Sequence, residues 1–179
     1  LPLILSIPFY FSIYNLTFLD SFFESISGFT STGFTIFPNI KNIDQGLILW
    51  RSSTQWLGGL YFLFSIVFLI DIYDENFKKT LTNFISFNSS EILKQVTKIF
   101  FLYSALTLFI FIILNLFSIR TFDSLNLAFS IISSGGFLPV NDLSNIIKDS
   151  SQIVVLSFLM LLSFFSIFFT YNLLFFKNK

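Results

Sequence analysis

Long apolar segments of the chain alternate with shorter segments that polar residues interrupt. Four segments are almost entirely apolar: residues 1–16, 47–70, 92–117 and 153–176. The second and third approach or exceed the roughly 20 residues that a helix needs to cross a bilayer. The first has the composition of the trailing part of a spanning helix, and Lys177 and Lys179 directly after the fourth are typical of a membrane interface. The pattern predicts about four spanning helices, the first truncated, in a piece of a longer protein.

Two further segments, 18–37 and 122–140, are moderately apolar and are interrupted by Asp, Ser, Thr and Gly. Each begins with about a dozen residues that are compatible with a helix. Twelve residues rise only about 18 Å in a helix, and the hydrocarbon core is roughly 30 Å thick. We therefore predict short re-entrant helices at about 20–29 and 122–132, each followed by a loop that leads back.

These two segments repeat each other at a distance of 103 residues. The shift places residues 20–34, DSFFESISGFTSTGF, on residues 123–137, DSLNLAFSIISSGGF. Identical residues then coincide in six pairs: Asp20 with Asp123, Ser21 with Ser124, Ser27 with Ser130, Ser31 with Ser134, Gly33 with Gly136 and Phe34 with Phe137. Because two predicted spans separate the copies, both return to the same membrane face. The sequence predicts a parallel internal repeat.

The repeated unit is span, short helix, glycine loop and span, which is the M1-P-M2 plan of cation channels. The expected fold class is an all-α membrane protein with M1-P-M2 repeats, re-entrant pore helices and filter loops. The first repeat covers residues 1–70, with a truncated M1, a pore helix at about 20–29, a filter loop at 30–35 and M2 at about 47–70. A cytoplasmic linker follows at 71–91. The second repeat covers 92–176, with M1 at 92–117, a pore helix at about 122–132, a filter loop at 133–138 and M2 at 151–176.

Polar residues at the start of each short helix are suited to capping. Thr17, Asp20 and Ser21 are favourable N-terminal residues, and Ser21 with Glu24 has the spacing of a capping box. Asp20 and its counterpart Asp123 are interpreted chiefly as caps, with attraction of cations at an outer mouth as the alternative. The negative C-terminal end of each helix then points toward a glycine loop and favours a cation there.

The glycine loops are the candidate ion site. Carbonyl oxygens that replace the water shell of an ion require backbone angles that glycine adopts readily, and Gly33 and Gly136 fit that role. The predicted site residues are Thr30, Ser31, Thr32, Gly33, Ser133, Ser134, Gly135 and Gly136, with potassium held by carbonyls near Gly33 and Gly136. Hydroxyl groups in these loops are expected to support the bent backbone. The alternative is that the two glycines are ordinary helix C-caps.

Two features of the segment 47–60, LILWRSSTQWLGGL, have structural interpretations. Gly58 and Gly59 are typical of close contact between membrane helices. Arg51 beside Trp50 is typical of an anchor at the membrane interface rather than of a pore lining.

Composition excludes several functions. Apolar residues make up 54% of the chain and charged residues 11%, whereas soluble domains average about 25% charged residues. The net charge is zero without a basic block, so we expect no nucleic-acid partner. Histidine and cysteine are absent, which removes zinc sites, iron-sulfur clusters and thiol nucleophiles. The opening LPLIL lacks a basic region ahead of the apolar run, so we expect no signal peptide.

An enzyme is not expected. An intramembrane serine protease needs a histidine, and an aspartyl protease needs two aspartates in neighbouring spans, whereas only Asp71 lies at the end of a span. A repeat-built secondary carrier is a second alternative, but such carriers commonly have broken spanning helices, and here the breaks lie in segments too short to span. The doubled loop favours a cation pathway.

Three ordered motifs resemble the Trk/Ktr/HKT superfamily of potassium uptake proteins, whose membrane subunit has four M1-P-M2 repeats. FFESISGFTSTGFT resembles the first pore loop of that family, LILWRSSTQWLGGL resembles the stretch after it, and FDSLNLAFSIISSGGFLPVND resembles the second pore loop. The resemblance covers essentially the whole chain and indicates the first two repeats. It departs from the bacterial pattern at Tyr61, which follows the glycine pair.

The resemblance implies a function and a setting. One glycine per loop would lie in the selectivity filter, at Gly33 and Gly136, and Gly33 favours potassium because serine there is associated with sodium preference in some plant members. A sodium-permeable or non-selective cation transporter of the same fold is the alternative. The resemblance further implies a multi-pass protein of the inner (plasma) membrane, a lipid bilayer around it, a homodimer and a cytosolic nucleotide-binding regulatory subunit. Potassium is then the substrate, no cofactor is expected, and the third-repeat gate loop is not in this sequence.

Overall fold

The protein is all-helical over the part of the chain that its structure, a computed structural model, describes: residues 1–73 and 89–165, with side chains at 1–65 and 96–165. Seven α-helices lie in these ranges: α1 (Pro2–Leu5), α2 (Ile7–Tyr10), α3 (Phe18–Phe29), α4 (Gln45–Tyr73), α6 (Ser89–Leu116), α7 (Thr121–Ile132) and α8 (Ser150–Phe164). Two 3₁₀ turns follow the short helices α3 and α7, at Ile40–Asn42 and Leu143–Asn145. The predicted all-α class is confirmed.

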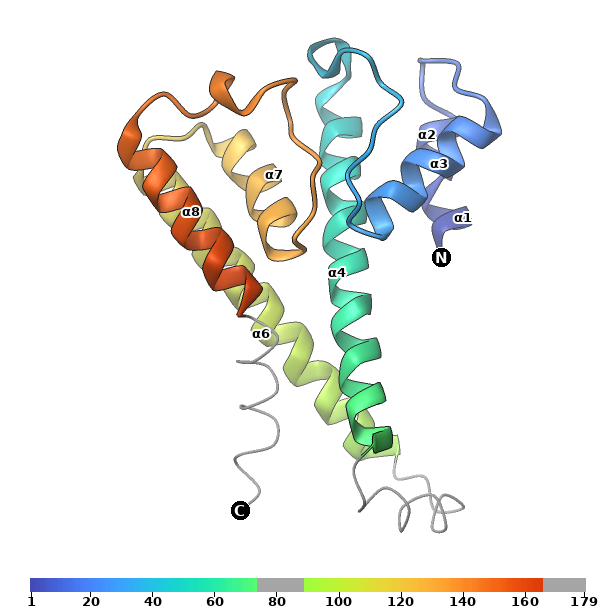
Figure 1. The fold of residues 1–179 in the computed structure, drawn as a ribbon. Coiled ribbons are helices and arrows are strands. Elements are labelled where there is room, and N and C mark those ends of the chain that lie inside the picture. Colours follow the sequence, from blue (N-terminus) through green and yellow to red (C-terminus); the bar gives the residue numbers. More distant parts are fainter. Residues whose placement is uncertain (74–88, 166–179) are drawn as a thin grey trace.

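The helix α4 stands at the centre of the arrangement (Figure 1). The short helix α3 packs on one side of α4 and the short helix α7 on the other. The helices α6 and α8 cover α7 from outside, and α1 and α2 pack against α3. The loops that follow α3 and α7 rise to the same end of the molecule (Figure 1).

The helices at the predicted spans differ in length and in how apolar they are. Within the described side chains, Val96–Leu116 of α6 is long and apolar enough to cross a membrane, and no other helix there meets both conditions. The helix α4 contains the predicted span 47–70 but carries four buried polar residues, Arg51, Ser52, Thr54 and Gln55. The helix α8 covers the first part of the predicted M2, and positions 166–176 of that segment lie outside the described residues, as do positions 74–88 of the predicted linker.

The N-terminal segment differs from its prediction. An uninterrupted helix across 1–16 was expected, but the structure breaks it at Ser6 and ends it at Tyr10. Pro8 has no N–H to continue the hydrogen-bond ladder, which accounts for a break close to it. Ser6 Oγ instead donates to the carbonyl oxygen of Leu3 at 2.8 Å. The segment therefore remains short and packs on α3.

The internal repeat is visible in the backbone. Both ends of α7 lie 103 residues after the corresponding ends of α3. The same shift relates the two 3₁₀ turns. It also pairs the four non-glycine residues that have positive φ in the described ranges: Asn15 (49°) with Ser118 (62°), and Ser31 (55°) with Ser134 (52°). Non-glycine residues seldom adopt this conformation, so the two halves share one backbone plan.

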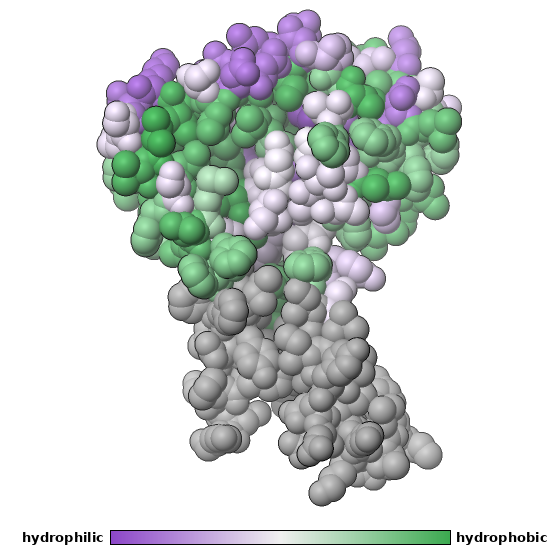
Figure 2. Space-filling view, in the orientation of Figure 1, coloured by the Kyte–Doolittle hydropathy of each residue, from purple (hydrophilic) through white to green (hydrophobic). Residues whose placement is uncertain are grey.

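Apolar side chains divide between the interior and one outer zone. The main core joins α4, α6, α7 and α8 around residues such as Tyr103, Ile110 and Leu159. Figure 2 shows hydrophilic residues at the end that carries the loops and hydrophobic residues below them. Many large apolar side chains are exposed, among them Phe101, Leu108, Ile112, Val154 and Leu161. The hydrophobic area in Figure 2 is typical of a protein that meets lipid or another subunit.

Two glycines allow α4 to receive both short helices. A β-carbon at Gly58 would overlap the carbonyl oxygen of Phe29, in the last turn of α3. A β-carbon at Gly59 would lie 2.5 Å from the Tyr103 hydroxyl and 2.8 Å from Ser133 Cβ, at the end of α7. The predicted role of both glycines in close helix contact is therefore confirmed.

Replacing Gly58 with alanine should destabilise the fold, because the added β-carbon meets the backbone of α3 rather than a movable side chain. We expect a loss of about 1–3 kcal/mol, measured as a lower midpoint of thermal unfolding of the purified protein. The control is Gly46→Ala, where the added carbon meets only the Asp44 carboxylate. Equal midpoints for the two variants would contradict the packing described.

Candidate ion-coordinating site

The two glycine loops touch each other through their backbones. A β-carbon on Gly33 would lie 2.5 Å from Gly136 Cα and 2.8 Å from its nitrogen. Conversely, a β-carbon on Gly136 would lie 3.3 Å from Gly33 Cα. Gly33 also has φ of +78°, a conformation that side chains rarely adopt. The structure therefore brings together the two residues that sequence analysis placed at the ion site.

Each loop leaves its helix in the same way. Thr30 and Ser133 are the C-caps of α3 and α7, and the left-handed residue after each cap is a serine, Ser31 or Ser134. The alternative that the two glycines are the C-caps is therefore wrong. The C-cap and the left-handed serine after it therefore determine the direction in which each loop leaves its helix.

Backbone N–H groups of the next residues turn back to the last helical turn. The N–H of Thr32 donates to the Ser27 carbonyl oxygen at 3.0 Å, and the N–H of Gly135 donates to the Ser130 carbonyl oxygen at 2.8 Å. These bonds satisfy carbonyl groups that a helix end otherwise leaves without partners. The two loops are thus anchored to their own helices by equivalent bonds.

Hydroxyl groups brace these turns, as predicted for Thr30 and Ser133. Thr30 Oγ1 donates to the Ile26 carbonyl oxygen at 2.8 Å, and its equivalent Ser133 Oγ donates to Phe129 at the same distance. The hydroxyl oxygens of Thr30 and Thr32 are 2.7 Å apart.

A further hydroxyl, on α3 rather than in the loop, also holds the first loop and was not predicted. Ser27 Oγ donates to the carbonyl oxygen of Phe34 at 2.6 Å. This bond ties the residue after Gly33 to the helix before the loop, so the loop is closed on both sides of the glycine.

The start of α3 differs from the predicted capping box. Thr17 is the N-cap: its hydroxyl accepts from the Asp20 N–H at 3.2 Å and donates to the Asp20 carboxylate at 2.7 Å. Ser21 Oγ donates to the Thr17 carbonyl oxygen instead. The predicted reciprocal pair of Ser21 with Glu24 is therefore wrong, and Glu24 lies fully buried inside the helix.

Asp123 lies in the first turn of α7, close to Arg120. The Arg120 Nε is 3.5 Å from the Asp123 carboxylate, and the arginine is 62% exposed. Burial raises the pKa of the Asp123 carboxyl above its usual value, and the charge of Arg120 opposes that rise. The interpretation of Asp123 as a cap is therefore wrong, because Arg120 is the N-cap of α7 and no side chain there makes a cap hydrogen bond. Asp123 is instead paired with Arg120.

Glu24 holds the outgoing part of the first loop and pairs with Arg51. Its carboxylate accepts from Thr35 Oγ1 at 3.0 Å, from the Ile36 N–H at 3.0 Å and from Arg51 Nε at 2.7 Å. Glu24 is 0% and Arg51 1% exposed. The prediction that Arg51 is an interface anchor is therefore wrong, because a charge buried this deeply needs a paired charge rather than water.

The guanidinium of Arg51 also reaches the second loop. Its Cζ lies 4.2 Å from the ring centroid of Phe137 and 5.6 Å from that of Phe37. Nη1 and Nη2 are buried without hydrogen-bond partners, and the two ring faces add to the attraction that the guanidinium receives from Glu24. Phe137, directly after Gly136, is 1% exposed.

Gln55 holds the second loop from the same helix. With its amide oriented to satisfy both ends, Oε1 accepts from the N–H groups of Gly136 and Phe137, each at 3.0 Å, and Nε2 donates to Ser130 Oγ at 3.2 Å. A β-carbon on Gly135 would lie 2.5 Å from the Gln55 amide carbon. Glycine at 135 therefore makes room for this amide.

These bracing side chains were not predicted, although one feature of the sequence points to them. Glu24, Arg51 and Gln55 are polar residues inside otherwise apolar helices, where unpaired polar groups are expensive. Such residues are expected to find one another, but spacing along the chain does not reveal which residues pair.

Hydrogen bonds of Asn141 join the two loops a second time, farther along the chain. The Asn141 side chain accepts from the Ile40 N–H at 2.7 Å and donates to Asn39 Oδ1 at 2.9 Å. Asn39 in turn accepts from the Lys41 N–H at 3.0 Å. The segments after Gly33 and Gly136 thus stay together after the glycine contact.

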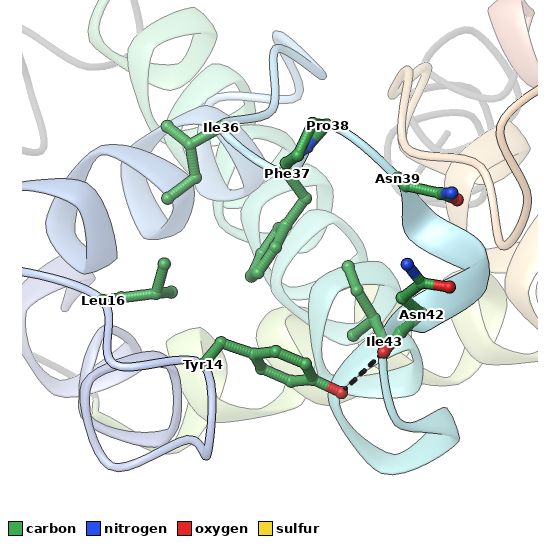
Figure 3. Close-up of a pocket in the computed structure, with 8 residues that line it drawn as sticks. All are labelled: Tyr14, Leu16, Ile36, Phe37, Pro38, Asn39, Asn42 and Ile43. Carbon is green, nitrogen blue, oxygen red and sulfur yellow. Dashed lines mark hydrogen bonds between the residues drawn. The ribbon is translucent and has the colours of Figure 1, made fainter.

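A cavity of about 270 Å³ lies beside the first loop but is not the ion site (Figure 3). Its lining is mainly apolar, and the Tyr14 hydroxyl at its edge donates to the Asn42 carbonyl oxygen at 3.1 Å (Figure 3). The lining residues are Tyr14, Leu16, Ile36, Phe37, Pro38, Asn39, Asn42 and Ile43. Neither Gly33 nor Gly136 belongs to it. Within the described residues, no group of three or more His, Cys, Asp or Glu side chains is placed to hold a metal.

Comparison with known proteins identifies similar transporters. The chain is 27% identical over 87% of its length to an uncharacterized cation transporter of Methanocaldococcus jannaschii. It is 28% identical over 74% of its length to the Trk system potassium uptake protein TrkH of Salmonella typhimurium. No family model matches the sequence.

A solved structure shares the fold. The potassium transporter TrkH from Vibrio parahaemolyticus superposes with a TM-score of 0.69 and 22% identity, over 83% of this chain and 30% of that one. The chain spans about a third of the length of the curated relatives it matches, 33% and 29% for the two named above.

Replacing Arg51 with glutamine should destabilise the protein by about 3–5 kcal/mol, because it leaves the buried Glu24 carboxylate without its charged partner. The matched control is Arg120→Gln, which removes an exposed partner and should change stability by about 0–1 kcal/mol. Both values follow from unfolding midpoints measured side by side. A loss at position 51 no larger than that at position 120 would contradict the buried ion pair.

Proposed function

Because the chain belongs to the Trk/Ktr superfamily, we propose that it is part of the ion-conducting membrane subunit of a potassium uptake system. The observation that carries this proposal is the backbone contact between Gly33 and Gly136. Two equivalent glycine loops that meet at one place supply carbonyl groups to one pathway.

In this proposal the helices follow the M1-P-M2 plan. α3 and α7 are the re-entrant pore helices, α6 is the M1 helix of the second repeat, and α4 and α8 are the M2 helices. The twelve residues of each short helix correspond to about 18 Å, too short to cross a hydrocarbon core of roughly 30 Å. The common direction of both loops (Figure 1) supports a filter at one end of the pathway.

Transport then requires no covalent step and no cofactor. A potassium ion exchanges its water shell for carbonyl oxygens near Gly33 and Gly136 and moves along its gradient or the membrane potential. The C-terminal ends of α3 and α7 lie next to the loops and contribute partial negative charge. A sodium-permeable or non-selective cation transporter of the same fold is the alternative.

Two phenylalanines at equivalent positions differ in exposure, and this difference supports a circular arrangement of more than two repeats around the pathway. Phe137 is 1% exposed and packs against Gly28 of α3, whose added β-carbon would lie 3.0 Å from the Phe137 ring. Its counterpart Phe34 is 68% exposed. A ring of repeats would give Phe34 the same kind of neighbour from another repeat.

The proposal extends to the setting of the protein. We place it in the inner (plasma) membrane as a multi-pass subunit surrounded by lipid, and the exposed apolar zone below the loops supports this placement (Figure 2). A homodimer and a cytosolic nucleotide-binding regulatory subunit are the proposed partners by analogy with the superfamily.

Replacing Gly33 with serine in the full-length protein should lower the preference for potassium over sodium. The added side chain meets the Gly136 backbone and displaces carbonyl groups, and a loss of about 1 kcal/mol per altered contact changes the ratio about fivefold. Flux of both ions in vesicles measures the ratio. Gly46→Ser, at an exposed position near the start of α4, is the control. An unchanged ratio in the Gly33 variant would contradict the filter assignment.

A further inference from the structure

We propose that Arg51 is a positioning residue for both glycine loops at once. With Glu24 and Gln55 it forms a buried unit, called here the α4 brace, through which a disturbance of the first loop reaches the second. The proposal concerns how the loops are held, and its consequence for selectivity rests on the proposed function.

Arg51 has a contact with each loop through a different part of its side chain. Its Nε donates to Glu24 at 2.7 Å, and the same carboxylate accepts from the Ile36 N–H of the first loop at 3.0 Å. Its guanidinium carbon, Cζ, lies 4.2 Å from the Phe137 ring centroid in the second loop. Because the arginine is 1% exposed, water does not screen either contact.

Gln55 extends the brace by one helical turn. Residues four apart on a helix lie on the same face, so Arg51 and Gln55 both point from α4 toward the loops. Gln55 accepts from the N–H groups of Gly136 and Phe137 at 3.0 Å. The second loop is therefore held at Phe137 by the guanidinium and by the amide.

The second half of the chain has no equivalent of this unit. At the shift of 103 residues, Leu127 occupies the position of Glu24 and Leu138 that of Thr35. The helix α7 therefore has no carboxylate at the position from which Glu24 binds the first loop. On α8, Val154 stands for Arg51 and Phe158 for Gln55. The backbone repeat is accordingly symmetric, whereas the polar bracing of both loops depends on α4.

This asymmetry gives a specific expectation. Glu24 bonds to the first loop and to Arg51, and within the described residues it makes no hydrogen bond to the second loop. If Arg51 links the loops, removing the charge of Glu24 releases the guanidinium from its place on Phe137. The second loop then loosens although the altered residue does not touch it, and coupling of this kind is reciprocal.

Hydrogen exchange of the full-length protein tests the link. In Glu24→Gln, we expect faster exchange by about fivefold or more in peptides covering 30–37 and also in those covering 133–140. Faster exchange confined to 30–37 would overturn the proposal. Asp20→Asn, a change at the exposed start of the same helix, is the control and should leave 133–140 unchanged.

A second variant keeps the test decisive if Glu24→Gln does not fold. Phe137→Leu retains an apolar side chain but removes the ring face from Arg51. The proposal expects faster exchange at the Ile36 N–H of the first loop. A change confined to the second loop would overturn it.

The consequence for selectivity is tested by Arg51→Lys, which keeps the charge but loses the planar group that lies on Phe137. The ratio of potassium to sodium flux should fall by about fivefold, whereas Arg120→Lys should leave it unchanged. An unchanged ratio in a folded Arg51→Lys protein would overturn the link between the brace and the filter. If the unaltered protein does not prefer potassium, the proposed function fails, and the exchange experiments still decide the coupling.

Discussion

The close approach of two backbones at Gly33 and Gly136 is the constraint on which the rest of the structure depends. With a β-carbon of Gly33 only 2.5 Å from Gly136 Cα, no side chain fits at this position. The approach requires that α3 and α7 end at the same depth, and the neighbouring glycines of α4 allow both helix ends to dock on one helix. The packing of α3 and α7 on α4 and the contact between the two loops thus depend on the same small residues.

Two different principles hold the loops in place. Helix ends with left-handed serines and returning N–H bonds give both loops the same local course, and these bonds recur at a shift of 103 residues. Buried polar side chains that brace the loops do not recur, since Glu24 and Arg51 have Leu127 and Val154 as counterparts. A repeated backbone can therefore carry non-equivalent side-chain networks, and in such a pathway each loop responds differently to the same substitution.

The helices and the loops could be predicted from the sequence because their signals are local. The length of the apolar segments and the repeated spacing of Asp and Gly located α3, α7 and the two glycines, whereas of the predicted caps only Thr17 of α3 makes a cap hydrogen bond. The helix break at Ser6 was not predicted, because the apolar residues of this segment were interpreted as one helix and the effect of Pro8 was not considered. The pairing of Glu24 with Arg51, 27 residues later, was also missed, because a single sequence shows which polar residues need partners but not which partner each one finds.

The most direct test of the central claim is to locate the ion in the full-length protein. Crystals grown with thallium, a potassium substitute with a strong anomalous signal, should show a peak bounded by backbone carbonyls of the loops around Gly33 and Gly136. A peak at that place agrees with a shared coordination site. Peaks only elsewhere, or a structure in which the two glycines stand apart, would contradict it.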